Sequence, residues 1–141
     1  MKNILLMLTI CALFSCKKNS NQELSSRNWR IASSTITPAM TLGSKTSTDF
    51  LALMGPSSCE ANTELSFSSD GIYTQGSNGA LCDMYYDTNS KPVTWTRNND
   101  RITLSSSPDF IFILSGNTLT STTYITTAGT TYTLVRVYKA K

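Results

Sequence analysis

From Glu64 onward, hydrophobic and polar residues alternate in short segments that polar turns separate. The alternation is clearest in residues 64–68, where Leu65 and Phe67 lie between polar neighbours, and residues 69–71 then turn the chain into residues 72–75. Alternation with a period of two is typical of strands with one buried face, and Asp-Gly supplies the positive φ angles of a tight hairpin. The pattern predicts a β-hairpin here and an all-β chain.

Six further segments have the Thr, Val, Ile, Tyr and Phe content of strands. They are residues 29–37, 93–96, 102–104, 110–114, 119–126 and 130–139. Eight strands joined mostly by short turns can form an open sheet, a sandwich or a closed barrel, and closure removes the exposed edges. We therefore predict an all-β, eight-stranded antiparallel up-and-down barrel. An interior of that size is either filled by side chains or just wide enough for one small ligand.

Helical periodicity is nearly absent, and the one exception lies between the first two predicted strands. Ser47 or Thr48 can cap a short helix over residues 49–54, which Gly55 and Pro56 would stop. The apolar side chains of this helix must be covered, so we expect it to close one end of the barrel.

The first sixteen residues have the features of a bacterial lipoprotein signal. Lys2 precedes an apolar run, residues 4–14, that is too short to cross a hydrocarbon core of about 30 Å as a helix. The run ends in Leu13, Phe14, Ser15 and Cys16, with a branched aliphatic residue three places before the cysteine and a small residue directly before it. An ordinary signal sequence or an uncleaved anchor is the alternative.

Cleavage before Cys16 divides the chain into three parts. Residues 1–15 are the signal peptide, residues 16–23 a tether with acyl chains such as palmitate on Cys16, and residues 24–141 a single barrel domain. An acidic cluster directly after the lipidated cysteine would resemble a signal for export to the cell surface, and no such cluster follows Cys16. We therefore expect an outer-membrane lipoprotein that faces the periplasm rather than the cell surface.

The cleavage model leaves two of the four cysteines unassigned. Cys11 is discarded with the signal and Cys16 takes lipid, so Cys59 and Cys82 remain as a pair in an oxidising compartment. A disulfide between them closes a loop of about 24 residues and contributes about 3 kcal/mol in the chain-entropy model. The chain contains no histidine, so a zinc site at these cysteines lacks ligands.

The net charge and the types of residue present exclude several classes of function. The formal charge of +3 falls to about +2 once Lys2 is removed, which leaves no basic footprint for nucleic acid. Without histidine, Ser-His-Asp and Cys-His catalysis are excluded, and Asp83, Asp87 and Asn89 do not have EF-hand spacing. Spacing alone leaves two-carboxylate catalysis open. We expect a monomer without enzyme activity, metal or cofactor.

Several of these residues together resemble the lipocalin-like domain of small lipoproteins of the Bacteroidetes type. The matching positions are Leu24, residues 28–31, Cys59 with Glu60, residues 65–73, Cys82, residues 93–95, residues 132–134 and Tyr138. The match covers nearly the whole mature chain. Arg27 replaces the glycine that lipocalins usually place two residues before the first-strand tryptophan, and the chain is shorter than classical lipocalins.

The resemblance implies a lipocalin-type fold, membrane attachment and the capacity to bind a small apolar molecule. It also implies that Arg136 packs on Trp29 as a cation–π pair of about 1 to 2 kcal/mol. Six aromatic residues are candidates either for the wall of the barrel lumen or for a packed core: Trp29, Phe67, Tyr73, Trp95, Phe112 and Tyr132. Tyr85 and Tyr86 would lie near the mouth.

Two functions are consistent with the sequence. In the first, the tethered barrel carries or senses a small hydrophobic ligand. In the second, the barrel is solid, and residues 38–62 and 76–92 contact another envelope protein. An enclosed apolar cavity of roughly 300 Å³ or more would favour the first function.

Overall fold

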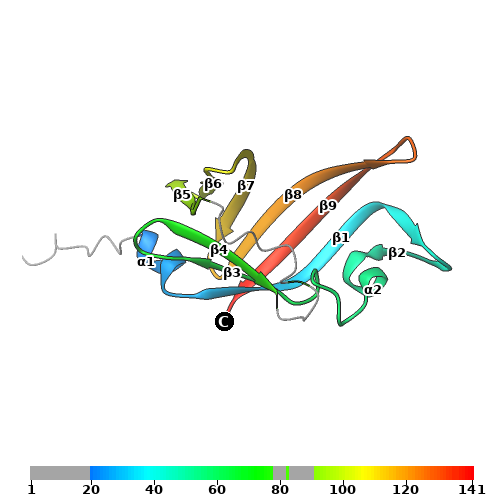
Figure 1. The fold of residues 1–141 in the computed structure, drawn as a ribbon, viewed down its shortest axis with the longest axis horizontal. Coiled ribbons are helices and arrows are strands. Elements are labelled where there is room, and N and C mark those ends of the chain that lie inside the picture. Colours follow the sequence, from blue (N-terminus) through cyan, green and yellow to red (C-terminus); the bar gives the residue numbers. More distant parts are fainter. Residues whose placement is uncertain (1–19, 78–81, 83–90) are drawn as a thin grey trace, which may run out of the picture.

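The computed structural model describes residues 20–77, 82 and 91–141, which form nine strands and two short helices (Figure 1). The elements are α1 (Ser20–Ser25), β1 (Asn28–Leu42), β2 (Lys45–Asp49), α2 (Phe50–Met54), β3 (Thr63–Phe67), β4 (Ile72–Ser77), β5 (Val93–Asn98), β6 (Arg101–Leu104), β7 (Ser107–Ser115), β8 (Thr118–Thr127) and β9 (Thr130–Ala140). Neither helix, nor any other in the described part of the chain, is long and apolar enough to cross a membrane.

Eight of the strands close into an antiparallel barrel, as the sequence predicts. Each of the strands β3 to β8 pairs with the next, β1 pairs with β3, and β9 returns to pair with β1 from Trp29 to Thr37. The ninth strand, β2, pairs with the far part of β1, which continues beyond the barrel as a hairpin. The sequence does not reveal β2, because every residue of Lys45–Asp49 is polar and none is buried.

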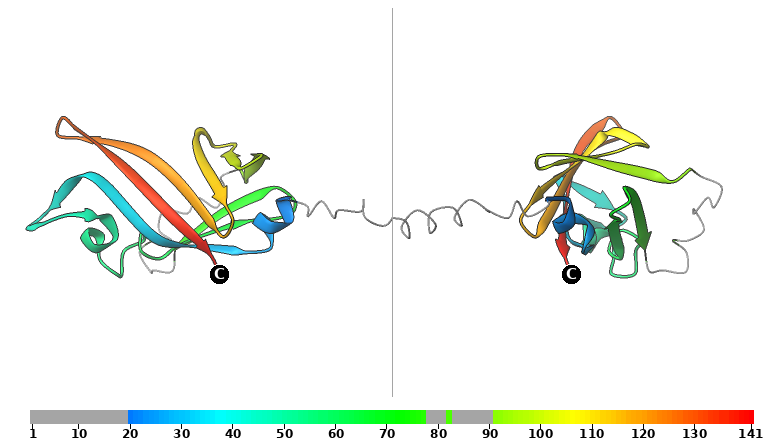
Figure 2. Two further views of the ribbon diagram at one scale, coloured as in Figure 1. Left: turned by 180° about the vertical axis from the view of Figure 1, so that it is seen from behind. Right: turned by 90° about the vertical axis from the view of Figure 1, so that its left-hand side faces the viewer.

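The two helices lie at opposite ends of the molecule (Figure 1). One end of the molecule holds α1 and the turns at residues 68–71, 99–100 and 116–117, and we call it the α1 end. The α2 end carries α2 and the turns at residues 43–44 and 128–129 (Figure 1). The right-hand view of Figure 2 looks from the α1 side and shows α1 in front of the strands.

Helix α2 occupies the predicted place between the first two barrel strands, but its cap differs from the expectation. The N-cap is Asp49, whose Oδ1 accepts from the Ala52 amide at 3.0 Å. Ser47 instead accepts from the Asp49 amide at 2.9 Å and so supports the cap from outside the helix. Gly55, at φ 85°, ends the helix in a conformation that favours glycine.

Helix α1 is a feature that the sequence pattern does not predict. It begins at Ser20, within the stretch expected to be a tether, and its Leu24 is fully buried. The Trp29 indole Nε1 donates to the Leu24 carbonyl at 3.1 Å. These contacts fix α1 to the barrel, so residues 20–23 belong to the folded unit.

A bulge in β1 decides which residues point into the barrel. Ile31 pairs with Tyr138 and Ser33 with Val137, so Ala32 is an extra residue in β1. The inward positions therefore change from Trp29 and Ile31 before the bulge to Ser34 and Ile36 after it, which are buried. This shift in register places Ser34 opposite Arg136.

Candidate functional site: the barrel interior

The half of the barrel near α1 is filled by aromatic rings. The Phe67 ring, which is fully buried, lies 5.2 Å from the Tyr73 ring, 5.9 Å from Trp95 and 5.8 Å from Phe112, measured between centroids. Phe112 also contacts Phe110 at 4.9 Å and Tyr138 at 6.0 Å. Edge-to-face contacts at such distances are those of a packed core. We call these residues, with the aliphatic side chains around them, the aromatic cluster.

The six aromatic residues singled out from the sequence are divided between two parts of the interior. Trp29, Phe67, Trp95 and Phe112 are buried in the aromatic cluster, and Tyr73 packs at its edge. Tyr132 packs instead against a smaller group at the α2 end, made of Ile36, Leu53 and Leu134, which we call the aliphatic plug. Tyr85 and Tyr86 lie outside the described residues.

A polar layer separates the aromatic cluster from the aliphatic plug. Arg136 lies between Leu134 and Tyr138 on the inner face of β9, and its Nε and NH2 donate to the two carboxylate oxygens of Glu60 at 2.6 and 3.3 Å. Its NH1 donates to Thr123 Oγ1 at 3.2 Å, and Ser34 Oγ donates to Glu60 Oε1 at 3.2 Å. The Arg136 and Glu60 side chains are only 19% and 16% exposed.

The expected cation–π pair between Trp29 and Arg136 is wrong. Trp29 pairs with Ala140, four residues along β9 from Arg136, a separation of about 13 Å at the usual rise of a strand. All three guanidinium nitrogens of Arg136 donate to Glu60 or Thr123. Arg136 does point inward as in the expectation, but its partner is an acid that follows Cys59.

Because the Glu60 and Arg136 ion pair is largely shielded from water, removing one partner is expected to be costly. Glu60→Ala should destabilise the fold by about 2 to 3 kcal/mol, since it leaves a shielded guanidinium without its counter-charge. The matched control is Glu64→Ala, which breaks the pair with Arg30, whose side chain is 50% exposed, and should cost less than about 1 kcal/mol. Urea unfolding measures both. Equal losses in the two variants would contradict the shielded role of Glu60.

Tyr138 and Ser121 border the polar layer on the side of the aromatic cluster. Burial raises the pKa of Tyr138 to about 12, while the positive charge of Arg136 opposes this shift and the negative charge of Glu60 adds to it. The buried Ser121 Oγ has no hydrogen bond of ordinary geometry, although it lies close enough to the phenol to lower the Tyr138 pKa slightly. The phenol is therefore held neutral in the folded protein.

This burial predicts a dependence of stability on alkaline pH. The folded protein favours the neutral phenol, so the contribution of Tyr138 is complete below its ordinary pKa of 10 and is lost as pH rises to about 12. A rise of the Tyr138 pKa from 10 to about 12 on folding corresponds to about 3 kcal/mol of unfolding free energy. Urea unfolding across this pH range should show the loss in the native protein and not in Tyr138→Phe. The same loss in both would show that Tyr138 is not its source.

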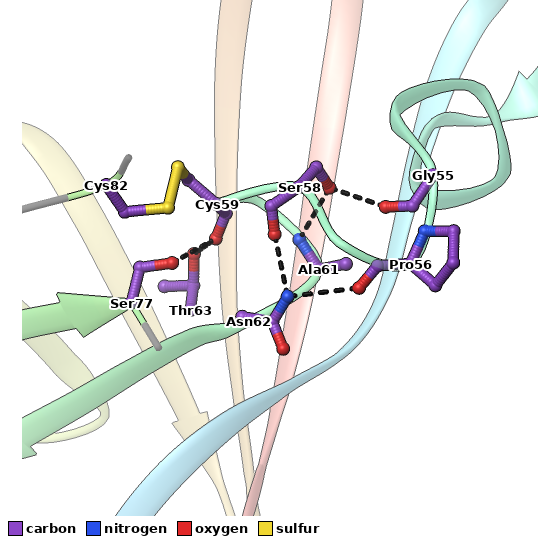
Figure 3. Close-up of a disulfide and its surroundings, with 9 residues drawn as sticks. All are labelled: Gly55, Pro56, Ser58, Cys59, Ala61, Asn62, Thr63, Ser77 and Cys82. Carbon is purple, nitrogen blue, oxygen red and sulfur yellow. Dashed lines mark hydrogen bonds between the residues drawn. A yellow bond between two sulfur atoms is a disulfide. The ribbon is translucent and has the colours of Figure 1, made fainter. Parts of the chain in front are cut away.

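The predicted disulfide is present and positions Glu60. Cys59 and Cys82 are bonded, with their Cα atoms 5.6 Å apart (Figure 3). The Cys59 carbonyl also accepts from Thr63 Oγ1 at 2.9 Å and from Ser77 Oγ at 2.8 Å. The bridge and these hydrogen bonds hold the segment before β3 against the barrel, so that Glu60 reaches Arg136.

Two surface clefts border β1 among the described residues, each about 200 Å³. One is lined by Ala32, Ser33, Ser34, Thr35, Thr48, Asp49 and Leu51, and the other by Arg30, Ile31, Ala61, Asn62 and Thr63. Both are smaller than the roughly 300 Å³ typical of ligand pockets, and neither is lined mainly by apolar groups. The described residues contain no group of three or more potential metal ligands. Asp83, Asp87 and Asn89 lie outside them.

The described residues define a closed antiparallel β-barrel whose interior is layered as aromatic cluster, polar layer and aliphatic plug. Comparison of the chain with protein-family models, with curated proteins and with solved structures finds no match. Its function is therefore argued from its own residues.

Proposed function

We propose that this chain is a lipid-anchored lipoprotein of the outer membrane whose lipocalin-like barrel has a solid core and serves as an interaction module for another envelope protein. The observation that carries the solid-core reading is the layered interior. The aromatic cluster, the polar layer and the aliphatic plug use the inner faces of the strands for contacts with one another. A partner protein would then bind to the outer surface of the barrel.

The anchor in this proposal rests on the sequence from Leu13 to Cys16. Helix α1 begins at Ser20, and three residues lie between it and Cys16 in the sequence. The lack of an acidic cluster after Cys16 supports a periplasmic orientation. Protease treatment of intact cells should then leave the barrel uncut, whereas digestion without permeabilisation would place it on the cell surface.

The α2 end is the best candidate for the partner's binding site. Leu42 is 50% exposed and Met54 is 42% exposed, and both lie at this end, on β1 and α2. Single exposed apolar residues are ordinary on proteins, but two at one end offer apolar anchors on a short hairpin and a helix. Both belong to residues 38–62, one of the two segments that would contact a partner in the second function considered from the sequence.

A photo-crosslinking amino acid in intact cells tests the module. Placed at Leu42 or at Met54, it should give the same discrete protein adduct, because both positions would face one partner. Placed at Ser69, an exposed control on the β3–β4 turn at the α1 end, it should not give that adduct. No adduct from Leu42 and Met54, or the same adduct from all three positions, would overturn the proposal.

A second candidate function, binding of a small apolar molecule, is favoured by the rim of the aliphatic plug. Met40, Phe50, Ile125 and Tyr132 pack around the plug but are only partly buried, so this end presents apolar surface. A ligand would lie there rather than among the aromatic residues. Native mass spectrometry and titration with a fluorescent apolar probe test this function. Saturable probe binding that Ile125→Asp abolishes would support it, and a lack of saturable binding would exclude it.

A further inference from the structure

We propose that the α1 end of the barrel rests on the membrane and binds anionic lipid headgroups through its basic residues, so that the α2 end points away from the bilayer. This inference depends on the proposed anchor at Cys16. It goes beyond that anchor because a lipid chain alone does not decide which surface of the barrel meets the bilayer.

The first argument is the reach of the tether. Four residue steps join Cys16 to Ser20, where α1 begins, and an extended chain spans at most about 3.6 Å per residue. The start of α1 therefore lies within about 14 Å of the lipidated cysteine. Because Leu24 and Trp29 fix α1 to the barrel, the whole α1 end is held at the membrane surface.

The second argument is the distribution of charge between the two ends. Among the described residues, the α1 end carries Arg27, Arg97, Arg101, Lys139 and Lys141 against Glu23, Asp70 and Asp100. The α2 end carries Lys45 against Asp49, and the charges of Lys91, before β5, and Asp109, on β7, cancel. The remaining charged residues form the two ion pairs of Arg30 with Glu64 and Arg136 with Glu60. The whole basic excess of the described chain thus lies at the α1 end.

The sequence next to the anchor adds to this asymmetry. Lys17 and Lys18 follow Cys16 directly, so their charges enter the same region between the lipid and α1. Among the described residues, the large exposed hydrophobic side chains are those of Leu42, Met54 and Tyr124, on β1, α2 and the far half of β8, and none of them lies at the α1 end. The contact with the membrane is therefore electrostatic, with phosphate headgroups as the ligands, and does not involve insertion of side chains into the hydrocarbon.

Nitroxide labels on the lipidated full-length protein test this orientation. The labels are placed at Ser69→Cys, on an exposed turn at the α1 end, or at Ser44→Cys, on the exposed β1–β2 turn at the other end. In each variant the introduced cysteine is the only free thiol, since Cys11 is removed with the signal peptide, Cys16 is acylated and Cys59 is bonded to Cys82. The proteins are reconstituted in vesicles of phosphatidylcholine alone or with phosphatidylglycerol.

The label at Ser69 should lie at the headgroups in the anionic vesicles, and the label at Ser44 should remain in water. A Lys or Arg near an anionic surface favours contact by about fivefold, so Lys139→Gln with Lys141→Gln should weaken the contact of the Ser69 label about 25-fold. The control, Lys45→Gln on the hairpin at the α2 end, should leave it unchanged.

Three outcomes would overturn the inference. If the Ser44 label lies as near to the headgroups as the Ser69 label, the orientation is wrong. If phosphatidylglycerol does not change the contact of the Ser69 label, recognition of anionic headgroups is wrong although the anchor stands. Protein that does not float with the vesicles would overturn the anchor, and this inference with it.

Discussion

Cys16→Ser is expected to move the protein from the membrane fraction to the soluble fraction while the barrel stays folded. Each buried methylene of an acyl chain contributes about 0.8 kcal/mol, so two or three chains on Cys16 supply nearly all of the attachment. The basic residues at the α1 end contribute much less. The buried core of the described residues, from Leu24 to Tyr138, is formed by the barrel and its two helices, so we expect the fold to persist without the acyl chains.

Fractionation after an alkaline wash measures this release, and near-ultraviolet circular dichroism of the released protein reports the packing of the aromatic cluster. Ser15→Ala is the matched control, because it keeps a small residue before Cys16 and should keep the protein in the membrane. Retention of Cys16→Ser after the alkaline wash would show that something other than acylation at Cys16 holds the protein.

Phe67→Ala is expected to have the largest effect on stability, about 3 to 5 kcal/mol. The ring is fully buried and contacts Tyr73, Trp95 and Phe112, so its removal leaves a cavity among large, rigid rings. Loss of the edge-to-face contacts adds to the loss of buried area.

Urea unfolding measures the effect of Phe67→Ala, and Tyr124→Ala is the control. Tyr124 is 74% exposed on β8, so its removal should change stability by no more than about 0.5 kcal/mol. If Phe67→Ala cost less than about 1 kcal/mol, the aromatic cluster would not be tightly packed, and a lumen among these rings would again be a reasonable reading.

The barrel could be predicted because its strands carry their own signals. Leu65 and Phe67 alternate with polar residues, and Gly71, at φ 88°, occupies a turn that favours glycine. Strand β2 carries no such signal, since its polar residues lie on an exposed hairpin. Helix α1 is only six residues long and is held by the burial of Leu24 under Trp29, a tertiary contact that no local pattern encodes.

The polar layer shows where sequence reasoning about the site fails. Arg136 lies two residues from both Leu134 and Tyr138, so a period of two already indicates that it points inward. The partner of Arg136 could not be predicted from this alternation, because Glu60 lies 76 residues earlier in the chain. Glu60 directly follows the disulfide-bonded Cys59. The register of β1 places Trp29 opposite Ala140, four residues along β9 from Arg136. The pairing of Cys59 with Cys82, in contrast, followed from counting cysteines once Cys11 is assigned to the expected signal peptide and Cys16 to the expected lipid.

The central claim is that a folded barrel is carried on lipid at Cys16. The intact mass of the protein extracted from membranes tests it most directly. We expect the mass of residues 16–141 with one disulfide and with two or three acyl chains on Cys16. The mass of an unmodified chain, or of a chain that still carries residues 1–15, would contradict the claim.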